Sequence, residues 1–432
     1  MLRSALALAL ILSWIGCTSA GAVSLEEAIN KSFNDNGIVR IKAGDRPPAS
    51  SRGNLAFTFN PTLNVPAGDS YVIVTDQIDP TCLESLNKLA RFHSGKILEI
   101  RNFRNLYKMP GARAQLVERL REANPKFVAF APRTENFSEN VVLAVWQLLL
   151  RLGDGKLTVY PSYLVARNSK DLDALVSKSI NRAQLHTADL HPVVIAQATD
   201  EKSGGMRSVQ KAVLTEDLFH ELGVDCPGLV IRTKSAPPPL EFPKIATLGT
   251  LSIEQAGHFI EKFPPAPTRA LSDARLILLF GHGLPGMTCS FVANAFENIP
   301  MQNDIVLCGS CFSATPPDSD LLKNSNGTRA ESLAFQVIAD GAQVFYGHMH
   351  ENSGFPQLFV AFEALMKGQS VGESFQQMMN TVIDTTKVPQ DRFVMSEDEL
   401  ADEQAVKQRN GLLFVMIGDP AAQPIAPSLE KP

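Results

Sequence analysis

The chain has 432 residues, enough to bury one large hydrophobic core or two ordinary ones. Hydrophobic residues make up 44% of it and charged residues 20%, which is typical of a folded globular protein and excludes a disordered or fibrous one. The net charge of −5, with no dense stripe of lysine and arginine, argues against nucleic acid as a partner.

The N-terminus has the features of an export signal. Arg3 precedes an apolar run, residues 5–15, that is too short to cross a bilayer, and residues 20–22 (Ala-Gly-Ala) fit a signal cleavage site. We therefore predict a signal peptide over residues 1–22 and an exported protein, periplasmic or extracellular. A lipid anchor at Cys17 is the competing interpretation. No later stretch is long and apolar enough to predict a transmembrane segment.

The cysteines favour a functional thiol over a disulfide scaffold. Signal cleavage would remove one of the six and leave an odd number, and a disulfide scaffold needs denser cysteines in a smaller chain. We therefore expect one free, functional cysteine. The six are Cys17, Cys82, Cys226, Cys289, Cys308 and Cys311.

The first part of the chain predicts an α/β unit. Residues 23–65 form an N-terminal segment that fits a propeptide, a small β-region or a linker. Beyond it, short apolar runs alternate with longer stretches of helical spacing, which indicates a first subdomain over residues 66–200. The predicted strands are 71–75, 96–100, 126–131 and 192–198, and the predicted helices are 83–92, 112–123, 140–152 and 169–180.

A looser stretch separates this unit from a second one. The turn at residues 202–205 and the stiff run of three prolines at 237–239 predict a linker over 201–245. A second subdomain, 246–425, and a tail, 426–432, follow. Its predicted strands are 276–280, 304–307, 342–346 and 412–417, with helices at 253–262, 330–339 and 357–367. Such alternation forms a layered α/β fold with helices on both faces of the sheet.

Two of the predicted strands end in side chains that can do chemistry at neutral pH. The apolar run 276–280 leads to His282, which stands between two glycines, and the run 305–307 leads to Cys308 and Cys311. Ligands of open α/β sheets gather at the carboxyl ends of strands. If these strands are neighbours, their tips lie about 5 to 10 Å apart, which lets a thiol and an imidazole act across one substrate.

These residue types suit nucleophilic catalysis. A cysteine attacks as the thiolate, and an adjacent imidazole promotes that form or gives a proton to the leaving amine. A glycine at position 283 lets the backbone N–H approach the substrate closely and donate to a developing oxyanion. The N–H of Cys311 is the natural second donor.

The two stretches, LILLFGHG and IVLCGSCFSA, resemble the His-Gly and Cys motifs of the peptidase superfamily that includes caspases, legumains, separases and gingipains. Residues 341–347 (GAQVFYG) and 414–420 (FVMIGDP) are similar to the gingipain branch, as are residues 160–177 and the unit before them. The resemblance covers roughly residues 70 to 425. It implies a caspase-like three-layer αβα sandwich with a mostly parallel sheet and two related subdomains.

The resemblance also implies a function. It makes the chain a cysteine peptidase that acts on a protein or peptide substrate and needs no cofactor or metal. His282 would be the catalytic histidine, Gly283 the glycine of the His-Gly motif and Cys311 the nucleophile, all in the second subdomain, and the first subdomain would be non-catalytic. Cys308 remains an alternative nucleophile, because two cysteines compete for that position.

Other patterns leave alternatives open. Cys308 and Cys311 form a C-x-x-C, as in redox pairs or half of a zinc site, but a second C-x-x-C is absent and the motif lies late in a long chain. Residues 281–286 match G-x-G-x-x-G after a strand, as in a dinucleotide site, but the acidic residue expected at the end of the next strand is missing.

A third pattern is the Gly-His-x-His of residues 347–350, which is similar to a metal motif of calcineurin-like phosphoesterases. Since the other motifs of that family are absent, we interpret His348 and His350 as surface histidines or as part of the active-site rim. We expect a structural role for Asp419. The rival functions are a catalytically degenerate caspase-like domain used for binding or secretion and, with weaker support, a nucleotide- or metal-dependent enzyme.

Overall fold

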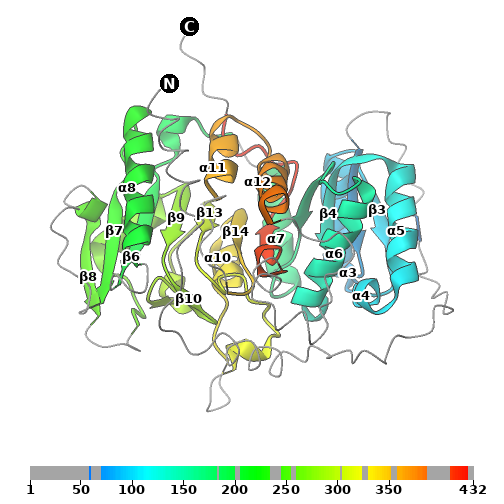
Figure 1. Cartoon of the computed structure of the whole chain (residues 1–432), viewed down its shortest axis with the longest axis horizontal. Coiled ribbons are helices and arrows are strands. Elements are labelled where there is room, and N and C mark those ends of the chain that lie inside the picture. The colour runs from blue at the N-terminus through cyan, green and yellow to red at the C-terminus, as the bar shows by residue number, and fades with distance from the viewer. Residues whose placement is uncertain are drawn as a thin grey trace, which may run out of the picture.

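One sheet of 12 strands runs through both predicted α/β units, in the order β1-β3-β2-β4-β5-β15-β14-β13-β9-β6-β7-β8 (Figure 1). The predicted signal peptide with Cys17, most of the segment 23–65 and the tail after residue 426 lie outside the described residues. The computed structural model describes residues 58–59, 70–181, 184–199, 205–233, 245–253, 259–301, 304–323, 329–351, 358–386 and 409–426.

The first half of the sheet closely follows the predicted elements. Its strands are β1 (Thr58–Phe59), β2 (Ser70–Thr75), β3 (Lys96–Glu99), β4 (Pro125–Ala131) and β5 (Tyr160–Tyr163). Its helices are α3 (Pro80–Phe92), α4 (Asn105–Lys108), α5 (Pro110–Ala123), η1 (Thr134–Asn136), α6 (Glu139–Leu152) and α7 (Ser169–Asn181). Consecutive residues of β2 are buried because helices cover both faces of the sheet. The strands and helices predicted up to residue 180 are confirmed, with small shifts of their ends.

The second half contains the two predicted reactive strands, β9 and β13. Its strands are β6 (Val193–Ala198), β7 (Gly228–Thr233), β8 (Gly249–Ile253), β9 (Leu276–Phe280), β13 (Ile305–Cys308), β14 (Val344–His348) and β15 (Phe414–Ile417). Its α-helices are α8 (Gly205–Glu221), α9 (Pro265–Asp273), α10 (Leu333–Asp340), α11 (Leu358–Met366) and α12 (Val371–Thr386), and the 3₁₀ turns are η2 (Thr187–Asp189), η4 (Ile245–Leu248), η5 (Ala293–Phe296) and η6 (Asp320–Leu322). A separate three-stranded sheet consists of β10 (Gly283–Leu284), β11 (Met287–Thr288) and β12 (Phe291–Val292).

The architecture is the predicted three-layer αβα sandwich. Every pairing in the large sheet is parallel except those of β1 with β3 and β14 with β15. Helices α3, α7 and α10 pack in one outer layer, and α5, α6, α11 and α12 pack in the other (Figure 1). None of the described helices has the length and apolar character that crossing a membrane requires.

The region between the two units differs from expectation. The described residues of the expected linker, 201–245, include α8 and β7, and β6 pairs with β9 in the second half of the sheet. The sequence pattern does not predict helix α8, because its apolar residues lie on more than one face. Phe219 is buried, whereas Leu214 and Leu218 are exposed. The division into a non-catalytic and a catalytic subdomain stays a prediction.

The predicted helix at 253–262 is wrong in its described residues. Ile253 ends strand β8, and residues 259–262 are not helical. The backbone N–H of Ile260 donates to the carbonyl of Ser290 at 3.0 Å, and Ile260 forms a bridge with Phe291. Extended pairing with the small sheet therefore replaces the expected helical hydrogen bonds.

A buried carboxylate joins the two halves of the sheet. Asp419, in the turn after β15, accepts a hydrogen bond from the Tyr71 hydroxyl at 2.9 Å, and its other oxygen lies 2.7 Å from His93 Nε2. The Tyr71 and His93 rings stack with their centroids 4.4 Å apart. Gly418 has a φ of +147°, which favours glycine. These contacts agree with the structural role expected for Asp419.

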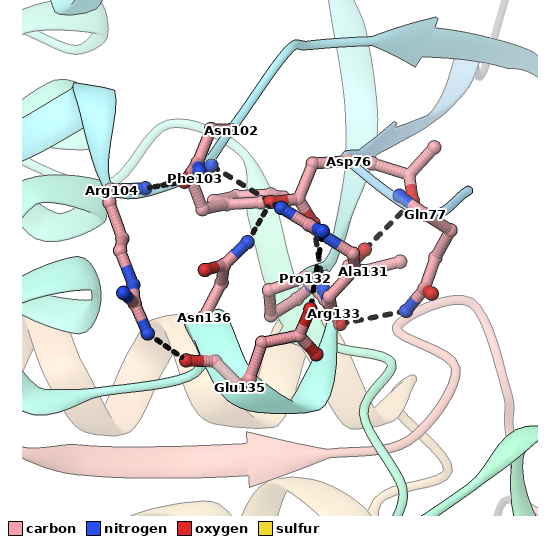
Figure 2. A network of polar contacts seen from close by, with 11 residues as sticks. Asp76, Gln77, Asn102, Phe103, Arg104, Ala131, Pro132, Arg133, Glu135 and Asn136 are labelled. Atoms are coloured by element: carbon pink, nitrogen blue, oxygen red, sulfur yellow. Dashed lines mark hydrogen bonds and ion pairs between the residues drawn. The ribbon is translucent and has the colours of Figure 1, made fainter. Parts of the chain in front are cut away.

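A second buried carboxylate organises the carboxyl end of the first half, as Figure 2 shows. Asp76, directly after β2, accepts hydrogen bonds from the backbone N–H of Phe103 at 2.9 Å, the backbone N–H of Arg133 at 2.7 Å and the side-chain amide of Asn136. Burial raises the pKa of this carboxyl, and these donors oppose the shift. One side chain thus holds together the loops that follow β2, β3 and β4.

Replacing Asp76 by asparagine should destabilise the first half of the protein. An amide in that place directs one N–H group at neighbours that are themselves donors, so Asp76→Asn should lower the free energy of unfolding by about 2 kcal/mol or more. Trp146 is buried in α6 and its fluorescence reports this half during urea unfolding. The control Asp189→Asn, at an exposed position, should change stability by less than about 0.5 kcal/mol. Equal midpoints for the two variants would contradict the structural role.

Candidate active site

The strands that carry the predicted reactive residues are direct neighbours. Strand β9 pairs in parallel with β13, with Leu276 opposite Ile305 and Leu279 opposite Cys308. The ladder continues past the strands, since the N–H of Gly309 donates to the carbonyl of Leu279 at 2.9 Å. The segments that follow both strands therefore leave the same edge of the sheet.

Gly283 brings these two segments into contact. A Cβ atom placed on Gly283 would lie 1.8 Å from the carbonyl oxygen of Cys311 and 3.0 Å from its backbone nitrogen. Any residue with a side chain would force the two main chains apart. The His282–Gly283 segment and Cys311 are therefore packed backbone against backbone.

The two competing cysteines have different surroundings. Cys311 is partly exposed and the neighbouring His282 is exposed, whereas Cys308 is completely buried. Burial raises the pKa of the Cys308 thiol, although hydrogen bonds involving Ser310 and Ser313 oppose the shift. A reagent or substrate that reaches this edge meets the Cys311 side chain and not that of Cys308.

The extension of strand β14 holds the turn after Cys311. Phe312 has a φ of +54°, an uncommon conformation for a residue with a side chain. Its N–H donates to the carbonyl of His350 at 3.2 Å, and the N–H of Ala314 donates to the carbonyl of His348 at 2.7 Å. The Phe312 and His350 rings lie 5.1 Å apart. The strained turn is thus fixed from one side by main-chain hydrogen bonds.

His348 and His350 are buried, which corrects their interpretation as surface histidines. His348 is fully buried at the end of β14 and His350 is almost so. Burial lowers the pKa of both imidazoles, and for His348 the proximity of Lys211 and His350 lowers the pKa further. Among the described residues, no group of three or more His, Cys, Asp or Glu side chains is arranged to hold a metal ion. The two histidines contribute packing and backbone acceptors to the site.

The glycine-rich segment after β9 does not form a dinucleotide fingerprint. Residues 283–288 form a hairpin of β10 and β11, in which Gly286 has a φ of +77°. A dinucleotide site needs a helix whose N-terminus begins at these glycines. The hairpin therefore removes the main support for the nucleotide-dependent alternative.

Sequence reasoning missed Gln197, which lies at the end of β6, next to β9. Its side-chain oxygen accepts a hydrogen bond from the backbone N–H of His282 at 2.6 Å. The backbone carbonyl of His282 accepts from the N–H of Cys289 at 2.9 Å. No local pattern reveals the first contact, because it joins residues 85 positions apart in the chain.

A polar cavity of about 610 Å³ lies beside α10 and η5 and includes Arg167, Glu297 and Glu331 in its lining. None of His282, Gly283, Cys308 and Cys311 lines it. The cavity is therefore not evidence for a substrate pocket at the two strand ends.

Comparisons with known proteins support the fold. The complex of Porphyromonas gingivalis RgpB pro- and mature domains matches with a TM-score of 0.50 and 10% identity, over 82% of this chain and 79% of that one. A structure described as a protease matches with a TM-score of 0.47 and 8% identity, over 83% and 79%. No protein-family model and no curated protein gave a match. The first match identifies the shared fold as the caspase-like one of gingipains and confirms the predicted fold class.

Replacing Gly283 by alanine should disrupt this edge of the sheet. The added methyl group clashes with the Cys311 carbonyl, so Gly283→Ala should destabilise the protein by about 1 to 3 kcal/mol and lower its thermal midpoint. The matched control is Gly111→Ala in α5, where a Cβ meets nothing within 4 Å. That variant should be at least as stable as the original chain because alanine favours a helix. Equal midpoints for both variants would show that the two main chains are not in contact.

The described cysteines should differ sharply in reactivity. Burial raises the pKa of Cys82 to about 11 and that of Cys226 to about 12, and it also raises the pKa of Cys289 and Cys308. At about pH 7.5 these four thiols should stay protonated and react slowly with iodoacetamide, because the thiolate is the nucleophile. Peptide mass mapping of the folded protein should find Cys311 modified first, and all five modified after unfolding. Equally fast modification of Cys308 in the folded state would contradict this arrangement.

Proposed function

We propose that the protein is an exported cysteine endopeptidase in which His282 and Cys311 act on a peptide bond of a protein or peptide substrate. The observation that carries the proposal is the contact between Gly283 and the main chain of Cys311, which holds a histidine and a partly exposed thiol at the ends of two adjacent parallel strands. The caspase-like fold supports it, since that fold is compatible with this chemistry at this edge.

The proposed reaction begins with attack by the Cys311 thiolate on the carbonyl carbon of the substrate. A carbon–sulfur bond forms and the carbonyl electrons move to oxygen, where the N–H groups of Gly283 and Cys311 stabilise the charge. The carbon–nitrogen bond then breaks, and His282 gives its proton to the leaving amine. Water attacks the resulting thioester with His282 as the base, which releases the acid product and restores the thiolate.

Cys311 is the preferred nucleophile and Cys308 the weaker alternative. The Cys308 side chain is buried and its pKa is raised, so both access and thiolate formation are unfavourable. The structure joins neither Cys308 nor Cys311 to another described cysteine by a disulfide. A disulfide between them would silence the proposed reaction, which makes reduction a condition for activity.

The cellular context of the proposal comes from the sequence. Residues 1–22 would direct export to the periplasm or outside the cell, by signal cleavage or with a lipid anchor at Cys17. Residues 23–65 would then be the N-terminal segment of the exported chain. Residues 246–425 would contain the catalytic subdomain, to which the pairing of β6 with β9 adds residues 193–198.

The test is a pair of cysteine variants assayed on a panel of fluorogenic peptides. Cys311→Ala should lower peptide cleavage by about 10³-fold or more, because it removes the nucleophile. Cys308→Ala is the matched control and should retain cleavage within about 10-fold, since it alters only a buried contact. Cleavage that survives in Cys311→Ala and is lost in Cys308→Ala would assign the reaction to Cys308. Absence of cleavage by the folded, reduced protein on the whole panel would instead favour the degenerate, binding domain.

A further inference from the structure

The hairpin that joins β11 and β12 has an unusual turn beside the candidate site. Met287 pairs with Val292 and Thr288 with Phe291, so the loop consists of the two residues Cys289 and Ser290. Both have positive φ, +49° and +67°. Two-residue hairpin loops of this kind strongly prefer asparagine and glycine, because other side chains are strained there. Here two consecutive residues with side chains adopt this strained conformation.

The side chains of both strained residues reach toward the candidate catalytic segments. The Ser290 hydroxyl accepts a hydrogen bond from the side-chain amide of Gln197, whose oxygen holds the His282 N–H at 2.6 Å. The Cys289 sulfur lies 3.4 Å from the hydroxyl of Ser310, the residue before Cys311. Each strained position thus contributes a side-chain contact that glycine could not make.

The contacts enclose the main chain of His282 on both sides. Gln197 holds its N–H, and the N–H of Cys289 donates to its carbonyl at 2.9 Å. A Cβ atom on Gly281 would lie 2.7 Å from Gln197 Cβ and 2.8 Å from the Cys289 sulfur, so these side chains pack directly against the start of the segment. Gln197, Cys289 and Ser290 are all more than nine-tenths buried.

We propose that Gln197, Cys289 and Ser290 form a positioning clamp that sets the place of His282 relative to Cys311. The inference rests on the proposed function, which it deepens by naming residues that act through the catalytic pair. Strain in the turn is tolerated because its side chains orient the base, and a base displaced by about 1 Å can cost about 10²-fold in rate.

The clamp should make activity respond much more strongly than stability to one substitution. Ser290→Gly relieves the strained φ but leaves the buried Gln197 amide without this acceptor, and these opposing effects should keep the change in thermal midpoint small. The same change removes the hydroxyl that orients Gln197, so kcat should fall by about 10-fold or more with little change in KM. Ser94→Gly is the matched control, because Ser94 is exposed and has a φ of +52° far from these residues in the chain. It should be at least as stable as the original chain and keep full activity.

A second readout does not depend on peptide cleavage. The rate of Cys311 modification by iodoacetamide should be measured by mass spectrometry between about pH 5 and pH 9 in the original chain, Ser290→Gly and Gln197→Met. In both variants the dependence of the modification rate on pH should move toward that of a thiol without a neighbouring base, whose rate is half-maximal at about pH 8.5. Ser94→Gly should reproduce the original profile.

The outcomes separate the clamp from the proposed function. Ser290→Gly with unchanged kcat and an unchanged profile overturns the clamp and leaves the peptidase proposal standing. A fall in kcat with the modification profile of the original chain also overturns it, because activity would then be lost without a change in the surroundings of Cys311. If the original chain cleaves no peptide, the peptidase proposal fails, and a shifted modification profile in Ser290→Gly still supports the clamp.

Discussion

The contact of Gly283 with the backbone of Cys311 is the constraint on which the candidate site depends. A Cβ at position 283 would lie 1.8 Å from the Cys311 carbonyl oxygen, so the close approach exists only because a glycine occupies that position. The approach in turn requires β9 and β13 to be adjacent and in register, which the pairing of Leu279 with Cys308 provides. The parallel sheet sets the positions of the two strand ends, and the small sheet that begins at Gly283 fixes the direction in which the chain leaves β9.

Three residues near this contact have positive φ values, which residues with side chains rarely adopt. Phe312 directly follows Cys311 and has positive φ, and so do the consecutive residues Cys289 and Ser290. Each is held by partners in or just after neighbouring strands: His350 after β14 for Phe312, and Ser310 after β13 and Gln197 in β6 for the turn. Strained conformations persist only where surrounding structure determines them, and here that structure is the sheet itself. The two carboxylates Asp76 and Asp419, in contrast, connect loops and halves of the sheet.

The sequence was most informative where one periodicity dominated. Continuous apolar runs such as β2 and β9 are buried on both faces and agree with the predicted strands. The sequence also placed His282 and Cys311 after two such runs, whose adjacency only the structure shows. Helix α8 could not be predicted because exposed leucines interrupt the apolar pattern of its buried face. Strand β7, which follows it, was not predicted either. The burial of His348 and His350 could not be read from a Gly-His-x-His pattern, because it depends on packing from other strands and helices.

The contact between Gln197 and His282 depends on the order of the strands in the sheet, which the sequence does not reveal. Gln197 meets His282 across 85 positions of sequence, since β6 and β9 are neighbours in space but are separated by α8, β7, β8 and α9 in the chain. Residue type and local spacing predict where a strand lies in the sequence and whether it is buried. Which strands become its neighbours depends on the topology of the whole sheet. His282 and Cys311 could be proposed from the sequence because their chemistry marks them individually. Gln197, by contrast, is an ordinary polar side chain, and only the order of strands in the sheet, which places it beside His282, distinguishes it from any other buried glutamine.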